Sequence, residues 1–187
     1  APITTRGQAE MKTKTITFSA LAAAAAVAVN AAEGLLPAAP FLPPGARLGL
    51  SNVITMLAAE RLGLAAALAA SAVKSLFVLL TRGFTAFLMS LAGGLISTLI
   101  CGIMLRKSTG WGYVGIGIIG AVLHNCAQSA VCSVWAGSAI LYYLPFLAAA
   151  SVVTGGLSGA LLAAAAKYIP REITEKGDDP CRMNTDR

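Results

Sequence analysis

The fold of this chain is decided by residues 62–105, which read LGLAAALAASAVKSLFVLLTRGFTAFLMSLAGGLISTLICGIML. Lys74 and Arg82 are the only charged residues in this stretch. A bilayer core of roughly 30 Å needs about 20 apolar helical residues, and the backbone polar groups inside it must be satisfied within the protein. The stretch therefore predicts two membrane-spanning helices, Leu62–Leu80 and Gly83–Leu105.

The same apolar pattern continues on both sides of this pair. It predicts four more helical segments: Ile16–Ala32, Leu48–Glu60, Gly112–Ala136 and Leu141–Tyr168. The chain is 57% hydrophobic and 12% charged, with a mean hydropathy of +0.75, which excludes an ordinary soluble domain. We expect an all-α integral membrane protein with a six-helix transmembrane domain over 16–168, an N-terminal tail over 1–15 and a C-terminal tail over 169–187. The second segment is short, at about 20 Å, so it either tilts or reaches only part of the way across.

The basic residues predict the orientation of the bundle, because cytoplasmic flanks carry the excess of Lys and Arg. With six spans and an internal N-terminus, the inner flanks hold Arg6, Lys12, Lys14, Arg61, Arg106, Lys107, Lys167, Arg171 and Lys176, and the outer flanks hold only Arg47 and Arg82. A second segment that did not cross would move most of these charges outside. We therefore expect both termini in the cytoplasm. The net charge of +6 follows this topology and suits an anionic inner leaflet rather than a nucleic acid.

Two features near the N-terminus have alternative explanations. The first apolar run follows Lys12 and Lys14 and is rich in alanine, so it also has some features of a signal peptide, but its cleavage would leave five spans and spoil the charge bias. Met11 is a candidate native start, which would leave residues 1–10 outside the fold.

Metal and cofactor sites are not expected from the cysteines. Cys101, Cys126 and Cys132 lie within predicted spans and Cys181 lies in the tail, with no CxxC and a single histidine in the chain.

Small residues form a ridge on the first helix. Ala20, Ala24, Ala28 and Ala32 recur every four residues, and Ala22 and Ala26 are expected to thicken the strip. Such ridges permit close approach of membrane helices. The partner is either another helix of this chain or a separate membrane subunit that docks on Ala20, Ala24 and Ala28. For the glycines of the fourth and sixth helices we expect packing within the bundle: Gly93, Gly94, Gly155, Gly156 and Gly159.

Polar residues within the predicted spans gather toward the outer half of the bundle. We predict a binding cavity open to the outside, with these candidate ligand contacts: Glu33, Asn52, Lys74, Arg82, His124, Asn125 and Gln128. His124 and Gln128 share a helix face at a spacing of four residues. Lys74 and Arg82, with Arg47 nearby, would bind an anionic group such as a carboxylate or phosphate, and apolar walls would hold an aromatic or isoprenoid body.

Each candidate also has a purely structural explanation. Lys74 could extend to the membrane interface, and Arg47 and Arg82 could be boundary charges without a ligand. His124 could be a core residue bonded to a carbonyl, and Asn52 could cap the helix that it begins. Asn125 and Gln128 could bond neighbouring helices to each other.

The loop over 33–51, EGLLPAAPFLPPGARLGLS, is too apolar and too rich in proline for a solvated linker. We expect it to fold back over the outer end of the bundle as a lid above the cavity.

Several blocks resemble the bacterial Gx transporter family, whose members are also called heptaprenyl diphosphate synthase component I. The blocks are EGLLPAAPFLPPGARLGLSNVITMLAAERLG (33–63), KSLFVLLTRGFTAFLMSLAGGLIS (74–97), GAVLHNCAQ (120–128) and YYLPFLAAASVVTGGLSGAL (142–161). The resemblance covers nearly all of residues 13–168, and PPGARLGLSN and the LHNxxQ pattern are its most specific parts. The family is similar to the substrate-binding S-components of energy-coupling factor (ECF) transporters.

The resemblance implies a fold and a set of partners. S-components are six-helix proteins of the bacterial inner or plasma membrane that bind a vitamin-like substrate under an outer loop. Their first helix docks through an AxxxA ridge on a transmembrane coupling subunit, which binds two cytoplasmic ATPases. ATP hydrolysis in the partners suits the absence of a GxxxxGK[ST] loop from this sequence.

The synthase name implies a different role. A prenyl diphosphate synthase needs aspartate-rich clusters that hold magnesium, and the only paired aspartates here, Asp178 and Asp179, lie in the polar tail before Pro180. We therefore do not expect an enzyme. A non-catalytic accessory subunit of heptaprenyl diphosphate synthase, or of isoprenoid quinone synthesis, remains an alternative, as does a membrane scaffold of an electron-transfer complex.

Overall fold

The computed structural model describes residues 3–35, 49–107, 110–137, 140, 142 and 144–169. These residues form six helices, and the fold is all-helical as predicted. The helices are α1 (Ile3–Leu35), α2 (Leu50–Arg61), α3 (Leu64–Arg82), α4 (Phe84–Arg106), α5 (Tyr113–Ala136) and α6 (Leu144–Tyr168). Five of them are long and apolar enough to cross a membrane, and the chain is a multi-pass membrane protein. The exception is α2, whose 12 residues span about 18 Å.

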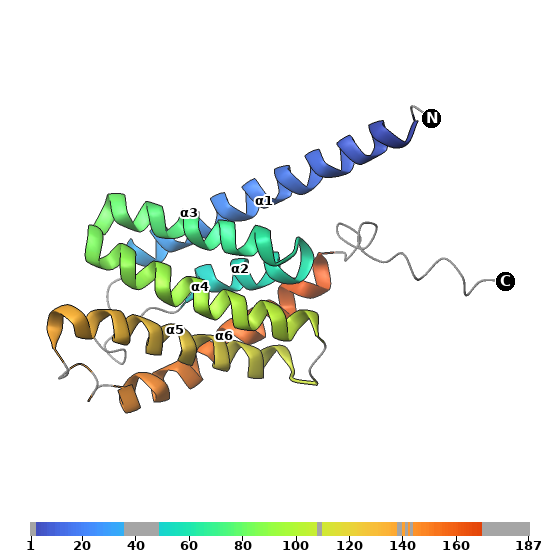
Figure 1. Ribbon diagram of the computed structural model, residues 1–187. Coiled ribbons are helices and arrows are strands. Elements are labelled where there is room, and N and C mark those ends of the chain that lie inside the picture. The colour runs from blue at the N-terminus through green and yellow to red at the C-terminus, as the bar shows by residue number, and fades with distance from the viewer. Residues whose placement is uncertain are drawn as a thin grey trace.

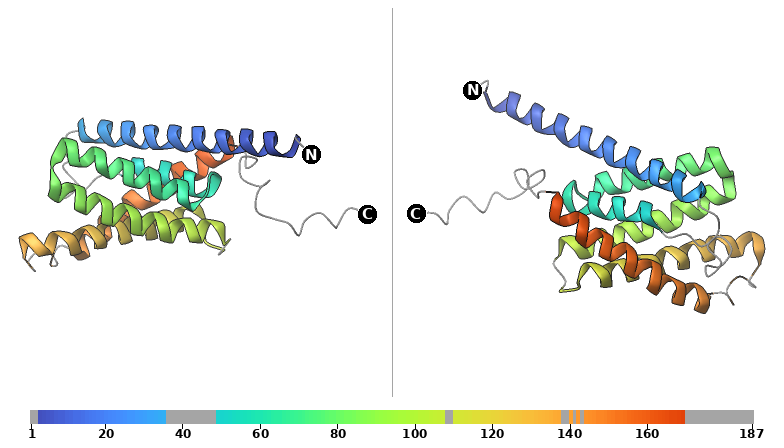
Figure 2. Two further views of the ribbon diagram at one scale, coloured as in Figure 1. Left: turned by 45° about the horizontal axis from the view of Figure 1, so that its top comes forward. Right: turned by 180° about the vertical axis from the view of Figure 1, so that it is seen from behind.

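Successive helices run in opposite directions, so α1 begins and α6 ends at the same end of the bundle (Figure 1). The short helix α2 lies in the middle and contacts α1, α3, α4 and α6. The other helices pack as neighbours in sequence, α3 on α4, α4 on α5 and α5 on α6, while α1 lies along one side against α2 and α3. The first turns of α1 project beyond the other helices (Figure 2).

Close helix packing depends on glycines at the contact between α5 and α6. A Cβ atom on Gly155 would lie 2.6 Å from Cα of Ile118, and one on Gly159 would lie 2.6 Å from Cα of Val114. Gly117 faces the backbone of both glycines from α5. Backbone atoms cannot move aside as a flexible side chain can, so only glycine permits this approach. Gly93 and Gly94 also pack inside the bundle, as predicted, but Gly156 faces open space, and its predicted packing role is wrong.

The outer surface of the bundle is apolar, whereas much of its interior is small or polar. Fully buried side chains include Thr55, Ser71, Ser75 and Ser151. Large apolar side chains face outward along the helices, for example Leu80, Val134 and Val153, which are 81%, 75% and 72% exposed. This inverted distribution is expected where lipid replaces water as the solvent.

The alanines of α1 divide between two faces. Ala20, Ala24, Ala28 and Ala32 are exposed, so the explanation of this ridge as packing within the chain is wrong. Ala26 is buried and Ala22 packs against a cluster formed by Ala58, Ala59 and Ala67 of α2 and α3. The expectation that Ala22 and Ala26 thicken the ridge is therefore wrong, because a spacing of two residues places them on the opposite side of a helix.

Two predicted segments differ from the structure or lie beyond the part that it describes. The chain is helical from Ile3, so most of the segment 1–15, expected as a tail, belongs to α1. Of the predicted lid over 33–51, Glu33–Leu35 belong to α1 and residues 50 and 51 begin α2, while residues 36–48, including Arg47, lie outside the described residues. The same holds for residues 170–187 of the C-terminal tail, with Asp178, Asp179 and Cys181.

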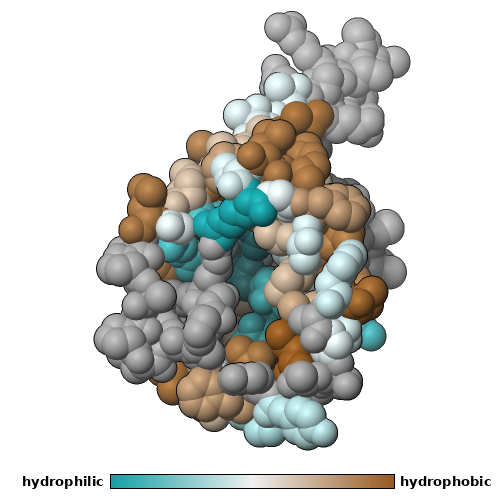
Figure 3. All heavy atoms as spheres, turned by 90° about the vertical axis from the view of Figure 1, so that its left-hand side faces the viewer, coloured by the Kyte–Doolittle hydropathy of each residue, from teal (hydrophilic) through white to brown (hydrophobic). Residues whose placement is uncertain are grey.

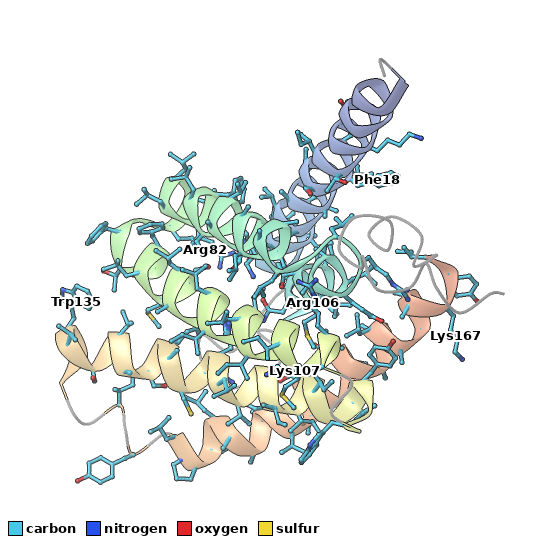
Figure 4. All side chains as sticks on the ribbon, turned by 45° about the vertical axis from the view of Figure 1, so that its right-hand side comes forward. Phe18, Arg82, Arg106, Lys107, Trp135 and Lys167 are labelled. Carbon is cyan, nitrogen blue, oxygen red and sulfur yellow. The ribbon has the colours of Figure 1, made fainter. Side chains whose placement is uncertain are left out.

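The end of the bundle at which α2 and α4 finish is called here the basic end. Its described basic residues are Arg61, Arg106, Lys107 and Lys167, and Figure 4 shows Lys167 near the end of α6, far from Trp135 at the opposite end of α5. The prediction that polar residues of the spans gather toward the outer half, leaving almost none in the inner half, is wrong at this end, which holds a polar cluster around Arg61.

The cluster at the basic end joins α2 to α5 and α6. Arg61 is only 5% exposed, and its Nη2 donates a 2.6 Å hydrogen bond to the carbonyl oxygen of Ala166 in the last turn of α6. Nη2 also lies 3.8 Å from Oε1 of Glu60, which accepts a 2.8 Å hydrogen bond from the Tyr113 hydroxyl group. Arg61 is therefore a structural residue and not a solvated flanking charge.

Candidate functional site

A cavity of about 260 Å³ lies between the helices, and all six helices contribute to its wall. It is reached from the end opposite the basic end, which is called here the cavity end. Figure 3 looks onto this end, and hydrophilic residues line the hollow at its centre. The exposed apolar residues of the perimeter therefore surround an interior that contains a polar-lined cavity.

The seven candidate residues all line this one cavity. They are Glu33 on α1, Asn52 on α2, Lys74 and Arg82 on α3, and His124, Asn125 and Gln128 on α5. Residues separated by almost a hundred positions in the chain therefore meet in one place. Each of the seven contributes to the cavity wall. Asn30, one helical turn before Glu33, also lines the cavity.

Lys74 is buried at the middle of α3 and points inward. Its exposed fraction is 3%, and its Nζ donates a 2.7 Å hydrogen bond to Oδ1 of Asn52. The explanation that Lys74 extends to the interface is therefore wrong. The explanation of Asn52 as a helix cap is also wrong, because α2 begins after Gly49 with no side-chain cap. An ammonium group has three N–H donors, so the contact with Asn52 leaves Lys74 able to bind a ligand.

Glu33 lies in the last turn of α1 and is 8% exposed. Its Oε1 accepts a 2.6 Å hydrogen bond from the backbone N–H of Leu50, which fixes the start of α2. Its Oε2 is buried and has no hydrogen-bond partner among the described residues. Glu33 and Lys74 attract each other electrostatically across the cavity but do not form an ion pair. A buried carboxylate oxygen without a partner is costly, so this position favours a ligand that supplies a donor.

Arg82 lies at the mouth of the cavity, where α3 ends. Its guanidinium group lies against Gly34 of α1, and a Cβ atom at Gly34 would overlap Nη2. Unlike Lys74, Arg82 is exposed. Gly83, with φ of 87°, follows at once and turns the chain directly into α4, since glycine adopts positive φ without strain. Arg82 is thus held beside the entrance by a one-residue turn.

His124 and Gln128 form a polar pair on α5. Gln128 Nε2 lies 2.9 Å from His124 Nε2, as the four-residue spacing predicts. Both side chains pack on Gly93 of α4, where a Cβ atom would lie 3.0 Å from Cγ of Gln128 and from Cε1 and Nδ1 of His124. The pair is therefore positioned by the absence of a side chain on the facing helix.

Asn125 bonds to the neighbouring helix α6. Its Nδ2 donates a 2.7 Å hydrogen bond to Oγ of Ser151, whose hydroxyl group in turn bonds to the carbonyl oxygen of Leu147. The expectation of interhelical bonding is correct for Asn125. Since Asn125 also lines the cavity, the hydrogen bond orients the amide and leaves its carbonyl oxygen as an acceptor.

Sequence reasoning missed the hydroxyl groups of the cavity wall. These are Ser51, Thr55, Ser90, Ser97, Thr98, Thr154 and Ser158. A partial signal exists, since Thr55 follows Asn52 by three residues and Ser158 follows Thr154 by four, which places each pair on one helix face. The wall is consequently more polar than expected, with Met56, Val78 and Met89 as its largest apolar members.

The described lining carries one carboxyl side chain, Glu33, and two basic side chains, Lys74 and Arg82. In the described part of the chain, no group of three His, Cys, Asp or Glu side chains is arranged to hold a metal ion. The cavity wall therefore offers groups that can pair with charges and form hydrogen bonds.

Comparisons with known proteins give one match. A sequence model of the family described as "Heptaprenyl diphosphate synthase component I" matches residues 22–165. This range includes all seven candidate residues. No curated protein and no solved structure matches the chain.

Proposed function

This chain belongs to the heptaprenyl diphosphate synthase component I family, and we propose that it is a membrane subunit that binds a small anionic molecule. In this proposal the subunit resembles the S-component of an ECF transporter. It captures its ligand in the cavity and has no catalytic role of its own. The observation that carries the proposal is the convergence of seven charged and polar residues on one cavity that opens at one end of the bundle.

The chemistry of the cavity supports binding rather than structural packing. Lys74 is buried with only one hydrogen bond, to a neutral amide, and Arg82 lies beside the entrance. An unpaired buried cation lowers the stability of the folded protein, so its retention is best explained by a ligand that pairs with it. A carboxylate or phosphate group would accept hydrogen bonds from Lys74, and Arg82 beside the entrance would add to the positive potential that attracts an anion.

The charge distribution supports an outward-facing entrance. Exposed Arg106, Lys107 and Lys167 lie at the basic end, opposite the cavity. Cytoplasmic flanks carry such excess positive charge, so the basic end would face the cytoplasm and the cavity end the exterior. The short helix α2 would then complete an even number of crossings, with both termini inside.

The exposed face of α1 supports a membrane partner. Ala20, Ala24 and Ala28 form a smooth strip that no other described helix covers. Small residues at a four-residue spacing permit another helix to approach closely. The proposed partner is a transmembrane coupling subunit, which would connect the protein to cytoplasmic ATPases.

A second function is favoured by the family name itself. As a component of heptaprenyl diphosphate synthase, the protein would hold a catalytic partner component at the membrane surface. The basic end, with Arg106, Lys107 and Lys167, would then be the surface that meets it. In this case the cavity would have no transported ligand.

Mass spectrometry of what accompanies the purified protein separates the two functions. The full chain is expressed alone in a bacterium, purified in detergent and denatured, and the released small molecules are identified. A tightly held molecule, present in wild type and lost from the Lys74→Met and Gln128→Ala variants, supports the binding function. Lys107→Met, which removes an exposed cation from the basic end, is the matched control and retains the molecule.

The opposite result is equally clear. A protein that retains no small molecule but captures a prenyl synthase in a fixed ratio, undisturbed by Lys74→Met, contradicts the binding function and supports the accessory one.

A further inference from the structure

We propose that the ligand is a compact, polar molecule that carries a polarised N–H group, such as an ammonium or a ring N–H, together with its anionic group. This inference rests on the proposed binding function and names the chemical class of its ligand. The inference depends on Glu33, whose carboxylate lines the same cavity as the basic side chains of Lys74 and Arg82.

Glu33 and Lys74 both face the cavity and attract each other, but they are not in contact. Glu33 and Lys74 are 8% and 3% exposed, yet no ion pair joins them. Glu33 uses one carboxylate oxygen to hold the backbone N–H of Leu50 and presents the other, without a protein partner among the described residues, in the cavity. A purely anionic ligand would bind Lys74 but leave this oxygen desolvated beside a like charge. A ligand with a donor N–H satisfies both groups.

The amides on α5 extend the same pattern deeper in the cavity. Asn125 donates its amide N–H to Ser151, and Gln128 directs its amide nitrogen toward His124. Both side chains line the cavity, and these contacts leave their carbonyl oxygens as acceptors. In contrast, Asn52 accepts from Lys74 and keeps N–H donors. The site therefore offers acceptors on α1 and α5 and donors on α2 and α3, which fits a ligand with both kinds of group.

The size and lining of the cavity favour a compact, polar molecule over a long prenyl chain. The volume of about 260 Å³ is below the roughly 300–1,000 Å³ of pockets for drug-sized ligands. Hydroxyl groups of Thr55, Thr98 and Ser158 line its wall where a prenyl chain would need continuous apolar surface. For this reason the proposed ligand has a compact polar body in place of the aromatic or isoprenoid body expected from sequence.

The test uses the protein in detergent, incubated with yeast extract as a source of vitamins, amino acids and nucleotides. The molecule retained after washing is released, exchanged into D₂O and identified by its accurate mass and fragmentation. We expect an acid whose fragments contain nitrogen and whose exchangeable hydrogens outnumber its acidic and hydroxyl groups. Farnesyl diphosphate, an anionic and apolar molecule without N–H, serves as the competitor and is expected not to displace it.

Glu33→Gln tests the role of the carboxylate without breaking the fold. The glutamine carbonyl oxygen still accepts the N–H of Leu50, while an amide NH₂ replaces the free oxygen and opposes a ligand donor. We expect at least tenfold weaker binding, or about 1.4 kcal/mol, because a hydrogen bond to a charged group is lost, and correspondingly less retained ligand. Lys107→Met is expected to retain the wild-type amount.

The outcomes separate this inference from the function on which it rests. An acid without N–H, displacement by farnesyl diphosphate, or wild-type retention by Glu33→Gln each overturns the inference while the binding function stands. A wild-type protein that retains no molecule from the extract overturns both.

Discussion

Gly93 on α4 and His124 on α5 are in such close contact that a Cβ atom at Gly93 would lie 3.0 Å from both Cε1 and Nδ1 of the imidazole ring. The same Cβ atom would lie 3.0 Å from Cγ of Gln128. A single missing methyl group therefore determines where two candidate ligand contacts lie in the cavity.

Gly93→Ala should weaken ligand binding more than it weakens the fold. The added methyl group contacts side-chain atoms, so His124 and Gln128 can shift by a few tenths of an ångström while the helices stay in place. We expect about tenfold weaker binding, or ~1.4 kcal/mol, with an unfolding temperature close to wild type. Gly156→Ala, which adds a methyl group where nothing lies within 4 Å, is the control. Equal binding by both variants would contradict the assignment of His124 and Gln128 to the site.

Gly117→Val should instead destabilise the whole bundle. Gly117 on α5 faces the backbone of Gly155 and Gly159, so a branched side chain must separate α5 from α6. Overpacking of this kind costs typically 1–3 kcal/mol, and the backbone contact places the cost at or above the upper value. Thermal unfolding in detergent measures it, with Gly156→Val, one residue from Gly155, as the control. Similar unfolding temperatures for the two variants would show that α5 and α6 do not meet at these glycines.

Lys74→Met should separate stability from binding. Methionine keeps most of the length of the side chain but removes a charge that is 3% exposed and bonded only to Asn52. We expect an unfolding temperature equal to or above wild type, because desolvation of the ammonium group is relieved. Binding of an anionic ligand should fall by about 10–100-fold, since its charge-assisted hydrogen bond is lost. A destabilised variant with unchanged binding would reverse the assignment and make Lys74 structural.

The helices and the convergence of the polar residues could be predicted because each depends on a simple pattern. Apolar runs of the length of a bilayer give the long helices, and alternating direction then fixes the depth of Glu33, Lys74 and His124. All three line the cavity in the structure. A helix also forms at the predicted second segment, but its 12 residues are too few to identify it as a span from length.

Other features could not be predicted because they depend on a partner from a distant helix. Arg61 has the sequence context of a flanking charge, and only the approach of α6 reveals its bond to the carbonyl oxygen of Ala166. The hydroxyl groups of the wall gave little signal because Ser and Thr also occur in apolar helices bonded to their own backbone, as Thr55 is to the carbonyl oxygen of Asn52. The buried and exposed faces of α1 cannot be distinguished from the sequence, because alanines occupy both faces.

Arg61→Met should destabilise the basic end. The substitution leaves the buried carboxylate of Glu60 without its nearby cation and frees the carbonyl oxygen of Ala166. Removal of one partner from a buried charged pair costs about 3–5 kcal/mol. Chemical unfolding in detergent measures the loss, and Arg106→Met, which removes an exposed charge from the same end, should cost less than about 0.5 kcal/mol. If Glu60→Gln restores none of the stability lost in Arg61→Met, the two residues are not coupled as the geometry requires.

Ala24→Leu should leave the protein folded and able to bind its ligand while it prevents assembly with a membrane partner. Ala24 is exposed on α1, so a larger side chain meets only lipid in the isolated protein. In a complex it would stand between two backbones that small residues allow to approach, and association would be lost. Co-purification with a co-expressed coupling subunit measures this, and Ala149→Leu, an exposed alanine on α6, controls for the added apolar surface. Ala26→Leu on the buried face of α1 should instead lower the unfolding temperature, because Ala26 is fully buried. Assembly that survives Ala24→Leu but fails with Ala149→Leu would move the docking surface from α1 to α6.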